Sequence, residues 1–534
     1  MPIRMEEDDP QGGGNRRPNS PDNNRGGGGM GWLIQLLPLA ILFLIKRPKL
    51  LFPILILGGI WYFFLGGQEM LSGGEPTEYV DNQDEDAPVQ FSLGASLSEE
   101  RFDKAQVFEP LAYSQSGSLN RLPRKMSLKQ YAPHPMHQGG QGSCVGWASA
   151  YAARTILQAR ATGQNPNQVV FSPAFLYNQI HLDNCQGAYM IEAMKNMSQN
   201  GAMPFQSFGY DESTCENYPS KTEIRQAQQY RIKGYNRLTV GADEYTPDVE
   251  AIKQNLAQGA PVVIGMMVGG SFMNNMIGRK VWQPTRSDYN MGGFGGHAMC
   301  VIGYDDDFEG GALQIMNSWG EDWGDRGIFW MSYEDFEYFT KEAYGLYPMG
   351  SAQDKQVNPG KMAIEFGLYD NEQKAVIPVK QVGDIVFRTS QPLAKGRKFK
   401  ALIANSVDCY VYIFGQETDN SSYVLFPYTE KHDPYCGIVG TRLFPKDHSM
   451  VPDATGQRDH MAIVISKTEL DYDAMNEKIN DAPGANYADK LKAALGNQRM
   501  RTAAFKAGNN TIAFEADVKE SAALVGVVIE VDKK

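Results

Sequence analysis

Two stretches of apolar residues lie close together near the start of the chain. Trp32 to Ile45 is apolar apart from Gln35, and Leu50 to Gly66 carries no charged residue. A helix that spans a bilayer needs about 20 apolar residues, within a range of about 17 to 25, so the second stretch is just long enough and the first is too short. The pattern predicts a membrane anchor over residues 32–66 with one spanning helix. A hairpin of two short helices is the alternative.

Charge differs between the two sides of this anchor. The cluster Lys46-Arg47-Pro48-Lys49 precedes the second stretch, and an acidic run follows it, at Glu69, Glu75, Glu78, Asp81, Asp84, Glu85 and Asp86. Because Lys and Arg tend to stay on the cytoplasmic side, we expect a single-pass protein with its N-terminus inside. A hairpin with a cytoplasmic N-terminus would place the basic cluster outside. Everything after residue 67 is then extracytoplasmic, which in a bacterium means the periplasmic side of the inner membrane.

The segments that flank the anchor are polar. Residues 1–31 are rich in Gly, Asn, Pro and charge, which predicts a disordered cytoplasmic tail. Residues 67–116 are acidic and predict a mostly unpacked stalk.

Residues 117–350 mix helical and strand patterns, which favours an α+β domain. Ala148 to Ala161 has apolar positions at helical spacing, and Ser172-Pro173 predicts the capped start of a helix that continues through Ala174 to Ile180. Short apolar stretches between Gly and Asp residues predict buried strands at Val262–Met267, Ala298–Tyr304, Leu313–Met316 and Ile328–Met331.

A polar linker at residues 351–362 leads into a second domain, residues 363–534. Aromatic and β-branched residues dominate its apolar stretches, so we expect a mainly-β domain. A polar insertion at Glu469–Leu495 is compatible with helix. The expected strands are Asp384–Thr389, Lys400–Ile403, Cys409–Phe414, Tyr423–Phe426, His460–Ser466 and Leu524–Val531.

Length and charge restrict the class of protein. A chain of 534 residues is too long for one hydrophobic core. A net charge of -12 argues against nucleic-acid binding, which needs clustered Lys and Arg. The six cysteines are too few and too scattered for a disulfide scaffold, and they include no CxxC pair, so we expect no metal and no cofactor.

One of these cysteines has a position suited to chemistry. Cys144 follows a Gly- and Ser-rich loop, residues 138–143, and comes directly before the predicted Ala148 helix. The amides and the positive end of the dipole at a helix N-terminus favour the thiolate, which is the nucleophilic form of cysteine. Most free cysteines are simply small buried residues, so Cys144 alone is weak evidence.

Two further segments supply partners for a nucleophile. Gly295-Gly296-His297-Ala298 places an imidazole at the start of an apolar strand. Asn317-Ser318-Trp319-Gly320 and Trp323-Gly324 then combine an amide with two tryptophans in a Gly-rich loop. Such an amide can orient an imidazole while the indoles shield their hydrogen bond from water.

Taken together, these segments resemble the papain-like (C1) peptidase family over roughly residues 120–347. Gln138 matches the oxyanion glutamine of the family, Cys144 the nucleophile, His297 the general base and Asn317 the residue that orients the base. The resemblance implies a two-lobed catalytic domain with a helical left lobe and a β-rich right lobe. It implies a cysteine endopeptidase that acts on protein or peptide substrates through a thiolate acyl-enzyme. A papain-fold protein that binds peptides or scaffolds without turnover is the alternative.

The chain departs from the family at several positions. Val145 stands where the papain signature has an aromatic residue, and Gln141 stands where it has a cysteine, so one usual disulfide is missing. Another family bridge implies that Cys185 pairs with Cys215. Gln141 also competes with Gln138 for the oxyanion role, although the spacing favours Gln138. No inhibitory propeptide is recognisable in the acidic stalk.

The C-terminal domain resembles a β-rich accessory domain of unknown function (DUF4384-like) that occurs beside bacterial peptidases. The resemblance rests on Asp408–Phe414, Val424–Pro427 and His460–Val464. We expect its aromatic residues to form the core of a β-sandwich, and this domain is the candidate site for a protein partner. Cys409 and Cys436 could form a disulfide in an oxidising compartment.

Overall fold

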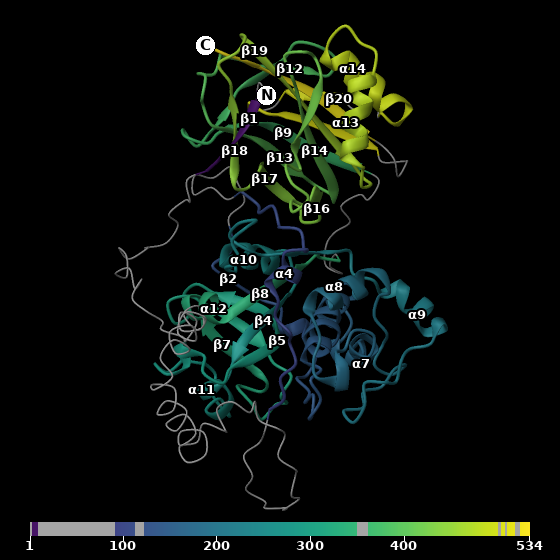
Figure 1. The fold of residues 1–534 in the computed structure, drawn as a ribbon, viewed down its shortest axis with the longest axis vertical. Helices are drawn as coiled ribbons and strands as arrows, with labels where there is room; N and C mark the ends of the chain where they lie inside the picture. The colour runs from purple at the N-terminus through teal and green to yellow at the C-terminus, as the bar shows by residue number, and fades with distance from the viewer. Residues whose placement is uncertain are drawn as a thin grey trace, which may run out of the picture. The chain divides into compact units, whose positions relative to one another are not determined.

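The computed structural model describes residues 3–8, 91–112, 122–349, 361–499, 504–507, 510–517 and 524–534. Residues Met1–Asp8 and Phe91–Lys534 belong to one compact unit, which contains the peptidase-like part and the C-terminal part (Figure 1). The anchor predicted at residues 32–66 and most of the linker predicted at 351–362 lie outside the described residues. Within the ranges given above, no helix has the length and apolar character needed to cross a membrane.

The helical lobe is built around one continuous helical stretch that begins at Cys144. It consists of α5 (Cys144–Gly146), the π-helix η2 (Trp147–Arg154) and α6 (Thr155–Thr162). Gly163 ends it in the left-handed conformation that glycine adopts readily. The predicted helix is confirmed and starts four residues earlier than its apolar pattern, at the end of the Gly-rich loop. The other helices of this lobe are α7 (Pro173–Tyr177), α8 (Met190–Gln199) and α9 (Lys221–Ala227), with 3-10 turns η1 (Lys129–Tyr131), η3 (Pro166–Gln168), η4 (Asp183–Cys185) and η5 (Gln228–Tyr230).

The predicted helix after Ser172 also forms. The Ser172 hydroxyl accepts a hydrogen bond from the Phe175 amide at 3.0 Å and so caps the first turn of α7. Its residues are buried, and the helix ends at Tyr177 rather than Ile180.

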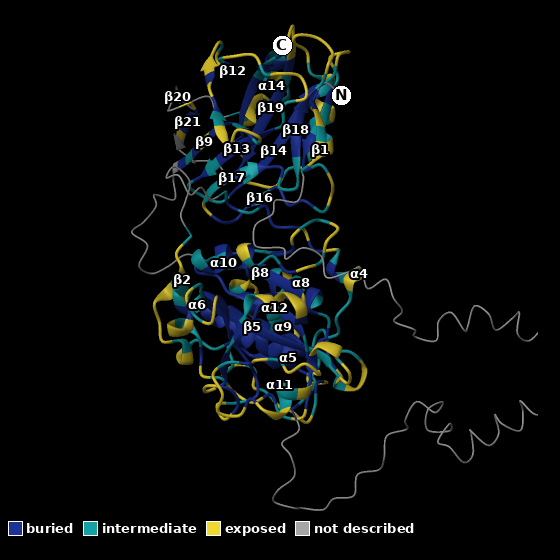
Figure 2. Cartoon of the chain, turned by 90° about the vertical axis from the view of Figure 1, so that its left-hand side faces the viewer, coloured by how far each residue is buried: buried dark blue, intermediate teal, exposed yellow. Residues whose placement is uncertain are grey.

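The β-rich lobe is an antiparallel sheet in the order β3-β8-β4-β5-β6-β7, with β2 paired to β5. The four strands predicted for this region all form. Its strands are β2 (Lys125–Ser127), β3 (Tyr235–Arg237), β4 (Val262–Val268), β5 (Gly295–Asp305), β6 (Ala312–Met316), β7 (Ile328–Ser332) and β8 (Thr340–Leu346), and its helices are α10 (Val249–Ala257), α11 (Gly270–Asn274) and α12 (Tyr333–Phe339), with the 3-10 turn η6 (Asp288–Asn290). Figure 2 shows the buried character of β5, which lies in the centre of the sheet.

The C-terminal domain is a sandwich of two sheets. One sheet has the order β1-β18-β13-β9-β21-β20 with β10 and β17 attached, and the other has the order β11-β12-β22-β19-β14-β15 with β16 attached. Its strands are β9 (Lys361–Asp370), β10 (Ala375–Ile377), β11 (Val379–Gln381), β12 (Val386–Thr389), β13 (Phe399–Asn405), β14 (Cys409–Gln416), β15 (Ser422–Phe426), β16 (Tyr435–Cys436), β17 (Gly440–Phe444), β18 (His448–Pro452), β19 (Arg458–Ser466), β20 (Ala504–Ala507), β21 (Ile512–Asp517) and β22 (Leu524–Asp532).

Successive side chains of a strand point to opposite faces of its sheet, so neighbouring residues join different hydrophobic clusters. On β14, Val411 and Ile413 pack between the sheets, whereas Tyr412 and Phe414 pack in a second cluster with two helices. These helices are α13 (Tyr472–Asp481) and α14 (Tyr487–Leu495), which fill the polar insertion expected at Glu469–Leu495, and the 3-10 turn η7 (Gly496–Gln498) follows them. Cys409 and Cys436 are opposite each other on β14 and β16 as free thiols.

Two predictions about the N-terminal part were wrong where the structure describes it. Residues Ile3–Glu7 of the expected disordered tail form β1, which pairs antiparallel with β18, and Ile3 is buried. Asp8 then forms an ion pair with Lys400 at 2.6 Å. Residues 91–112 of the expected unpacked stalk are folded against the peptidase part and include α4 (Glu99–Phe102), whose Phe102 is buried. Both segments are short, and their apolar residues gain partners only from distant parts of the chain.

Candidate active site

Cys144 lies at the N-terminus of the central helix and against the first residues of β5. Its Sγ accepts a hydrogen bond from the Ala298 amide at 3.4 Å, and Ala298 directly follows His297. Both Cys144 and His297 are 0 % exposed. The helix of one lobe and the sheet of the other therefore bring the predicted thiol and the predicted imidazole together, although 152 positions separate them in the sequence.

The imidazole of His297 is held by the amide of Asn317. The His297 Nε2–H group donates to Asn317 Oδ1 at 2.7 Å, and the Ser318 amide donates to the same oxygen at 2.7 Å. The pairing of β5 with β6 delivers this contact, because His297 is near the start of β5 and Asn317 directly follows β6. His297 Nδ1 is buried without a hydrogen-bond partner among the described residues. This nitrogen is left to exchange a proton with a neighbouring group.

Two tryptophans enclose the His297–Asn317 hydrogen bond. The Trp319 ring stacks on the His297 ring with centroids 4.4 Å apart and planes inclined by 26°. Trp323 meets Trp319 edge to face at 5.3 Å. Both indoles are buried, so water is kept from the hydrogen bond and the imidazole is fixed in one plane.

The two candidate oxyanion glutamines have different surroundings. Gln138 is buried, and its side-chain oxygen accepts from the Ser318 hydroxyl at 2.7 Å while its Nε2 donates to the Gln141 carbonyl at 2.9 Å. The second Nε2–H of Gln138 remains available. The Gln141 amide is directed to the carbonyls of Asp211 and Glu212, at 3.4 and 3.5 Å. Gln138 is thus positioned beside the Asn317 loop, and Gln141 is engaged elsewhere.

Burial keeps the thiol and the imidazole neutral in this conformation. It raises the pKa of Cys144 to about 12, although the amides of Ala298 and Val145 counteract the shift. Burial also lowers the pKa of His297 to about 4, with a smaller opposing effect from Asn317. Neither group carries its charge at neutral pH while the site is closed.

A segment of the chain itself, residues 91–98, lies along this site. The Ala95 amide donates to the Gly296 carbonyl at 3.0 Å, next to His297. The Ala188 amide donates to the Gly94 carbonyl at 2.9 Å, and the Ser96 amide donates to the Ala188 carbonyl at 3.0 Å, which makes a parallel bridge between Ala95 and Ala188. The acidic stretch, in which no inhibitory propeptide is recognisable from the sequence, thus contains a segment that lies along the site.

Packing also fixes residues 91–94, the first part of this segment. The Phe91 ring stacks on Trp319 at 4.6 Å, and the Trp319 indole N–H donates to the Ser92 carbonyl at 3.1 Å. In the middle, a Cβ added at Gly94 would come within 2.0 Å of the Gly142 carbonyl oxygen, so only glycine fits beside the Gly-rich loop. Alternation of Phe91, Leu93, Ala95 and Leu97 was the sequence signal for an extended segment.

Sequence reasoning also missed Glu342 on β8. This residue is 4 % exposed, and its carboxylate accepts from the Ser98 amide at 2.8 Å and from the Tyr344 hydroxyl at 3.1 Å. Burial raises the pKa of Glu342 to about 7. It is paired with Gly265 on β4, and a Cβ at Gly265 would meet the Leu97 side chain. Its strand also contains Thr340 and Lys341, so no pattern within the strand marked Glu342 as a buried carboxyl group.

The disulfide implied by the family resemblance is confirmed between Cys185 and Cys215. The Cys185 carbonyl accepts from the Gly142 amide at 3.3 Å and from the Tyr177 hydroxyl at 2.7 Å. The bridge therefore supports the loop next to Ala188. In the part of the chain that the structure describes, no group of three or more His, Cys, Asp or Glu side chains is arranged to hold a metal ion.

Comparison with known proteins agrees with this geometry. Residues 123–348 match the model of the papain family of cysteine proteases. An uncharacterized peptidase C1-like protein of Acanthamoeba polyphaga mimivirus is 29% identical over 219 residues, which cover 40% of this chain and 68% of that protein. A cathepsin B-like protein of Giardia intestinalis is 27% identical over 226 residues, which cover 39% of this chain and 69% of that protein.

Among solved structures, xylellain, a cysteine protease from Xylella fastidiosa, aligns with a TM-score of 0.37 and 24% identity over 48% of this chain and 95% of that one. The family match spans the segments that contain Gln138, Cys144, His297 and Asn317, and a cathepsin B-like relative matches 39% of this chain. Residues 123–348 are therefore a papain-family cysteine peptidase domain.

Proposed function

We propose that Cys144, His297, Asn317 and Gln138 perform acyl transfer on peptide bonds. The Cys144 thiolate attacks the peptide carbonyl, and protonated His297 donates a proton to the leaving amine and later activates water. The free Nε2–H of Gln138 and the Cys144 amide stabilise the oxyanion. The observation that carries this proposal is the fixed imidazole, held at Nε2 by Asn317 and unpartnered at Nδ1.

The chemistry requires that residues 91–98 leave the site. A nucleophile that is 0 % exposed cannot meet a substrate, and the same segment uses the Gly296 carbonyl and the Ala188 main chain, which a bound peptide would need. Its departure also removes part of the burial that keeps Cys144 and His297 neutral, so the thiolate–imidazolium pair becomes accessible. The described conformation thus supports an enzyme that is inactive until this segment moves.

Replacing the nucleophile separates a peptidase from a binding protein. Cys144→Ala should abolish cleavage of peptide libraries and labelling by an epoxysuccinyl thiol-protease inhibitor. Cys300→Ala, which removes another buried free thiol, on β5 of the same domain, should retain both activities. Mass spectrometry of the labelled protein identifies the modified residue. Labelling of Cys144 with no cleavage of any peptide would instead support the alternative of a binding protein without turnover.

The two glutamines provide a matched test of the oxyanion site. Gln138→Ala should lower kcat by about a hundredfold or more, which is the usual effect of removing one oxyanion donor. Gln141→Ala should change kcat by much less, because its amide is directed to the carbonyls of Asp211 and Glu212. Steady-state kinetics on one peptide substrate measure both variants. A larger loss for Gln141→Ala would reassign the donor.

We also propose that Glu342 selects substrates with a basic side chain at the position that Leu97 occupies. No Lys or Arg of the described residues forms an ion pair with this buried carboxylate, and its Ser98 N–H donor departs with the segment. A buried carboxylate that loses a donor is costly unless a new donor or cation replaces it. An Arg or Lys of the substrate would supply both.

The selectivity should depend on Glu342 and on pH. Glu342→Gln should lower the ratio of kcat/KM for an Arg substrate to that for a Leu substrate by roughly tenfold, which corresponds to about 1.4 kcal/mol. Glu337→Gln, on α12, should leave the ratio unchanged. Because burial raises the pKa of Glu342 to about 7, its charge and the preference for Arg should increase as the pH rises through this value. A ratio that is unchanged in Glu342→Gln would exclude this role.

Membrane attachment through residues 32–66 is proposed from their composition, with both ends of the segment on one side of the bilayer. Residues 3–8 pair with β18 and so belong to the same folded unit as the C-terminal domain. Hydrogen-bonded strands cannot lie on opposite sides of a membrane, so the single pass expected from charge conflicts with this pairing. With both ends outside, the cluster at Lys46–Lys49 would face the cytoplasm, as basic residues prefer.

The proposed compartment is extracytoplasmic, at the inner membrane of a bacterium. The Cys185–Cys215 disulfide supports an oxidising environment. The relation of residues 363–534 to the DUF4384-like domain, and a protein partner for this domain, stay predictions.

Labelling of introduced cysteines in intact bacteria tests this topology. Ser20→Cys should react with a membrane-impermeant maleimide, and Pro48→Cys should be protected until the cells are opened. The native free thiols described by the structure are buried and give the background signal. Protection of Ser20→Cys together with reaction of Pro48→Cys would reverse the orientation. Protection of both would place the N-terminal part inside.

A further inference from the structure

The chain that leaves the cleft continues directly into a segment that is bonded to two domains. Residues 103–112 follow α4, form isolated β-bridges at Val107 and Leu111, and are here called the shared strand. On one side they bond to the peptidase domain. The Arg237 amide donates to the Gln106 carbonyl at 2.9 Å, and the Phe108 amide donates to the Arg237 carbonyl at 3.2 Å. Farther along, Leu111 exchanges two hydrogen bonds with the Gln254 side chain, at 2.8 and 3.1 Å.

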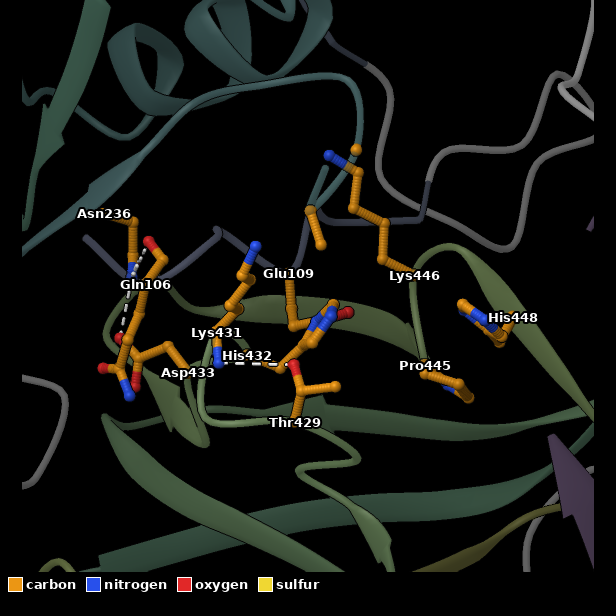
Figure 3. Close-up of polar contacts among 12 residues, drawn as sticks. Gln106, Glu109, Asn236, Thr429, Lys431, His432, Asp433, Pro445, Lys446 and His448 are labelled. Atoms are coloured by element: carbon orange, nitrogen blue, oxygen red, sulfur yellow. Dashed lines mark hydrogen bonds and ion pairs between the residues drawn. The ribbon is translucent and has the colours of Figure 1, made fainter. Parts of the chain in front are cut away.

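On its other side the shared strand is held by three consecutive residues of the C-terminal domain, Glu430 to His432, which together with Asp433 are here called the clamp loop. The Lys431 carbonyl accepts from the Val107 amide at 2.7 Å, and the Lys431 ammonium group forms an ion pair with Asp103 at 3.0 Å. The Glu430 carbonyl accepts from the Gln106 side chain at 3.4 Å. Figure 3 shows Glu109 beside His432, and Gln106 near Asn236 and Asp433.

The clamp loop also makes a buried side-chain contact with the shared strand. His432 Nδ1 and Glu109 Oε1 are 2.8 Å apart, with His432 0 % and Glu109 4 % exposed. Arg442, also buried, donates from Nε to the Glu109 carbonyl at 3.0 Å. When one partner of such a pair is removed, the other is left buried without compensation, so the attachment weakens steeply.

The clamp loop is itself anchored on the peptidase domain. Asp433 accepts from the Asn236 side-chain amide at 2.7 Å and from the Tyr347 hydroxyl at 2.6 Å. All of these groups are buried. The loop therefore contacts the peptidase domain directly as well as through the shared strand, and the shared strand is enclosed between them.

We propose that the C-terminal β domain retains the cleft segment, residues 91–98, in the active site by holding the shared strand. This inference rests on the proposed function, because the cleft is that of the peptidase. Only α4 separates the two segments, so a fixed shared strand keeps residues 91–98 at a high effective concentration beside the cleft. Any partner that draws the clamp loop away from Glu109 raises the fraction of molecules in which Cys144 is accessible.

The test measures access to Cys144 in the full chain. Glu109→Ala should increase the rate of labelling by an epoxysuccinyl inhibitor by about tenfold or more, the factor that corresponds to a loss of one buried charged contact at its weakest. Asp459→Ala is the matched control, because Asp459 forms a buried ion pair with Lys533 at 2.6 Å in the same domain and does not touch the shared strand. Thermal unfolding shows whether each variant is folded.

Two further variants keep the result decisive. Lys431→Ala removes a half-exposed ammonium group and should fold even if Glu109→Ala does not, with a smaller increase in labelling. Leu97→Ala loosens the cleft segment without touching the clamp loop. Labelling that rises in Leu97→Ala but not in Glu109→Ala or Lys431→Ala would overturn the clamp and leave the peptidase intact. An equal rise in Asp459→Ala would also overturn it, since general destabilisation would explain the effect.

Peptide cleavage is recorded beside labelling to separate the two proposals. Faster labelling of Glu109→Ala with parallel cleavage supports both the clamp and the peptidase. Faster labelling without cleavage supports the clamp and contradicts the proposed function.

Discussion

The hydrogen bond between His297 Nε2 and Asn317 Oδ1 is the contact on which the rest of the site depends. It fixes which imidazole nitrogen carries the proton and so leaves Nδ1 for proton transfer. The bond is possible because β5 and β6 are neighbours, and it persists because Trp319 covers it. Ser318, which follows Asn317, in turn fixes Gln138 by donating a hydrogen bond to its side-chain oxygen. One strand pairing thereby places three of the four candidate catalytic side chains.

The same burial that orders these groups also suppresses their chemistry. A thiol with its pKa raised and an imidazole with its pKa lowered form a neutral pair, which suits storage better than catalysis. Residues 91–98 take part in this state through main-chain bonds that would suit almost any extended peptide, and through Phe91 on Trp319. On the proposed function, reactivity would depend on the position of this short segment rather than on a change within the catalytic groups.

The elements that depend on the nearby pattern of apolar and turn residues could be predicted from the sequence. The helix after Cys144, the cap at Ser172 and the strands around His297 follow from apolar spacing and turn residues, and the Asn317-Ser318-Trp319-Gly320 motif identified the orienting residue. Segments whose partners are far away could not be predicted in this way. Ile3 and Phe91 are buried by residues hundreds of positions distant or across a lobe boundary, and their flanks are polar, so composition alone favoured disorder. Glu342 was overlooked because nothing in its own strand shows what faces it.

The pairing of β1 with β18 has a practical consequence for work with this protein. A common route to a soluble peptidase is to remove everything that precedes the catalytic domain, here roughly the residues before position 123. That deletion would take away β1 as well, with buried Ile3 and the Asp8 partner of buried Lys400. The edge of β18 would then present unpaired main-chain groups, which favours association between molecules. The shortened protein would therefore tend to aggregate unless the first eight residues were joined back to it.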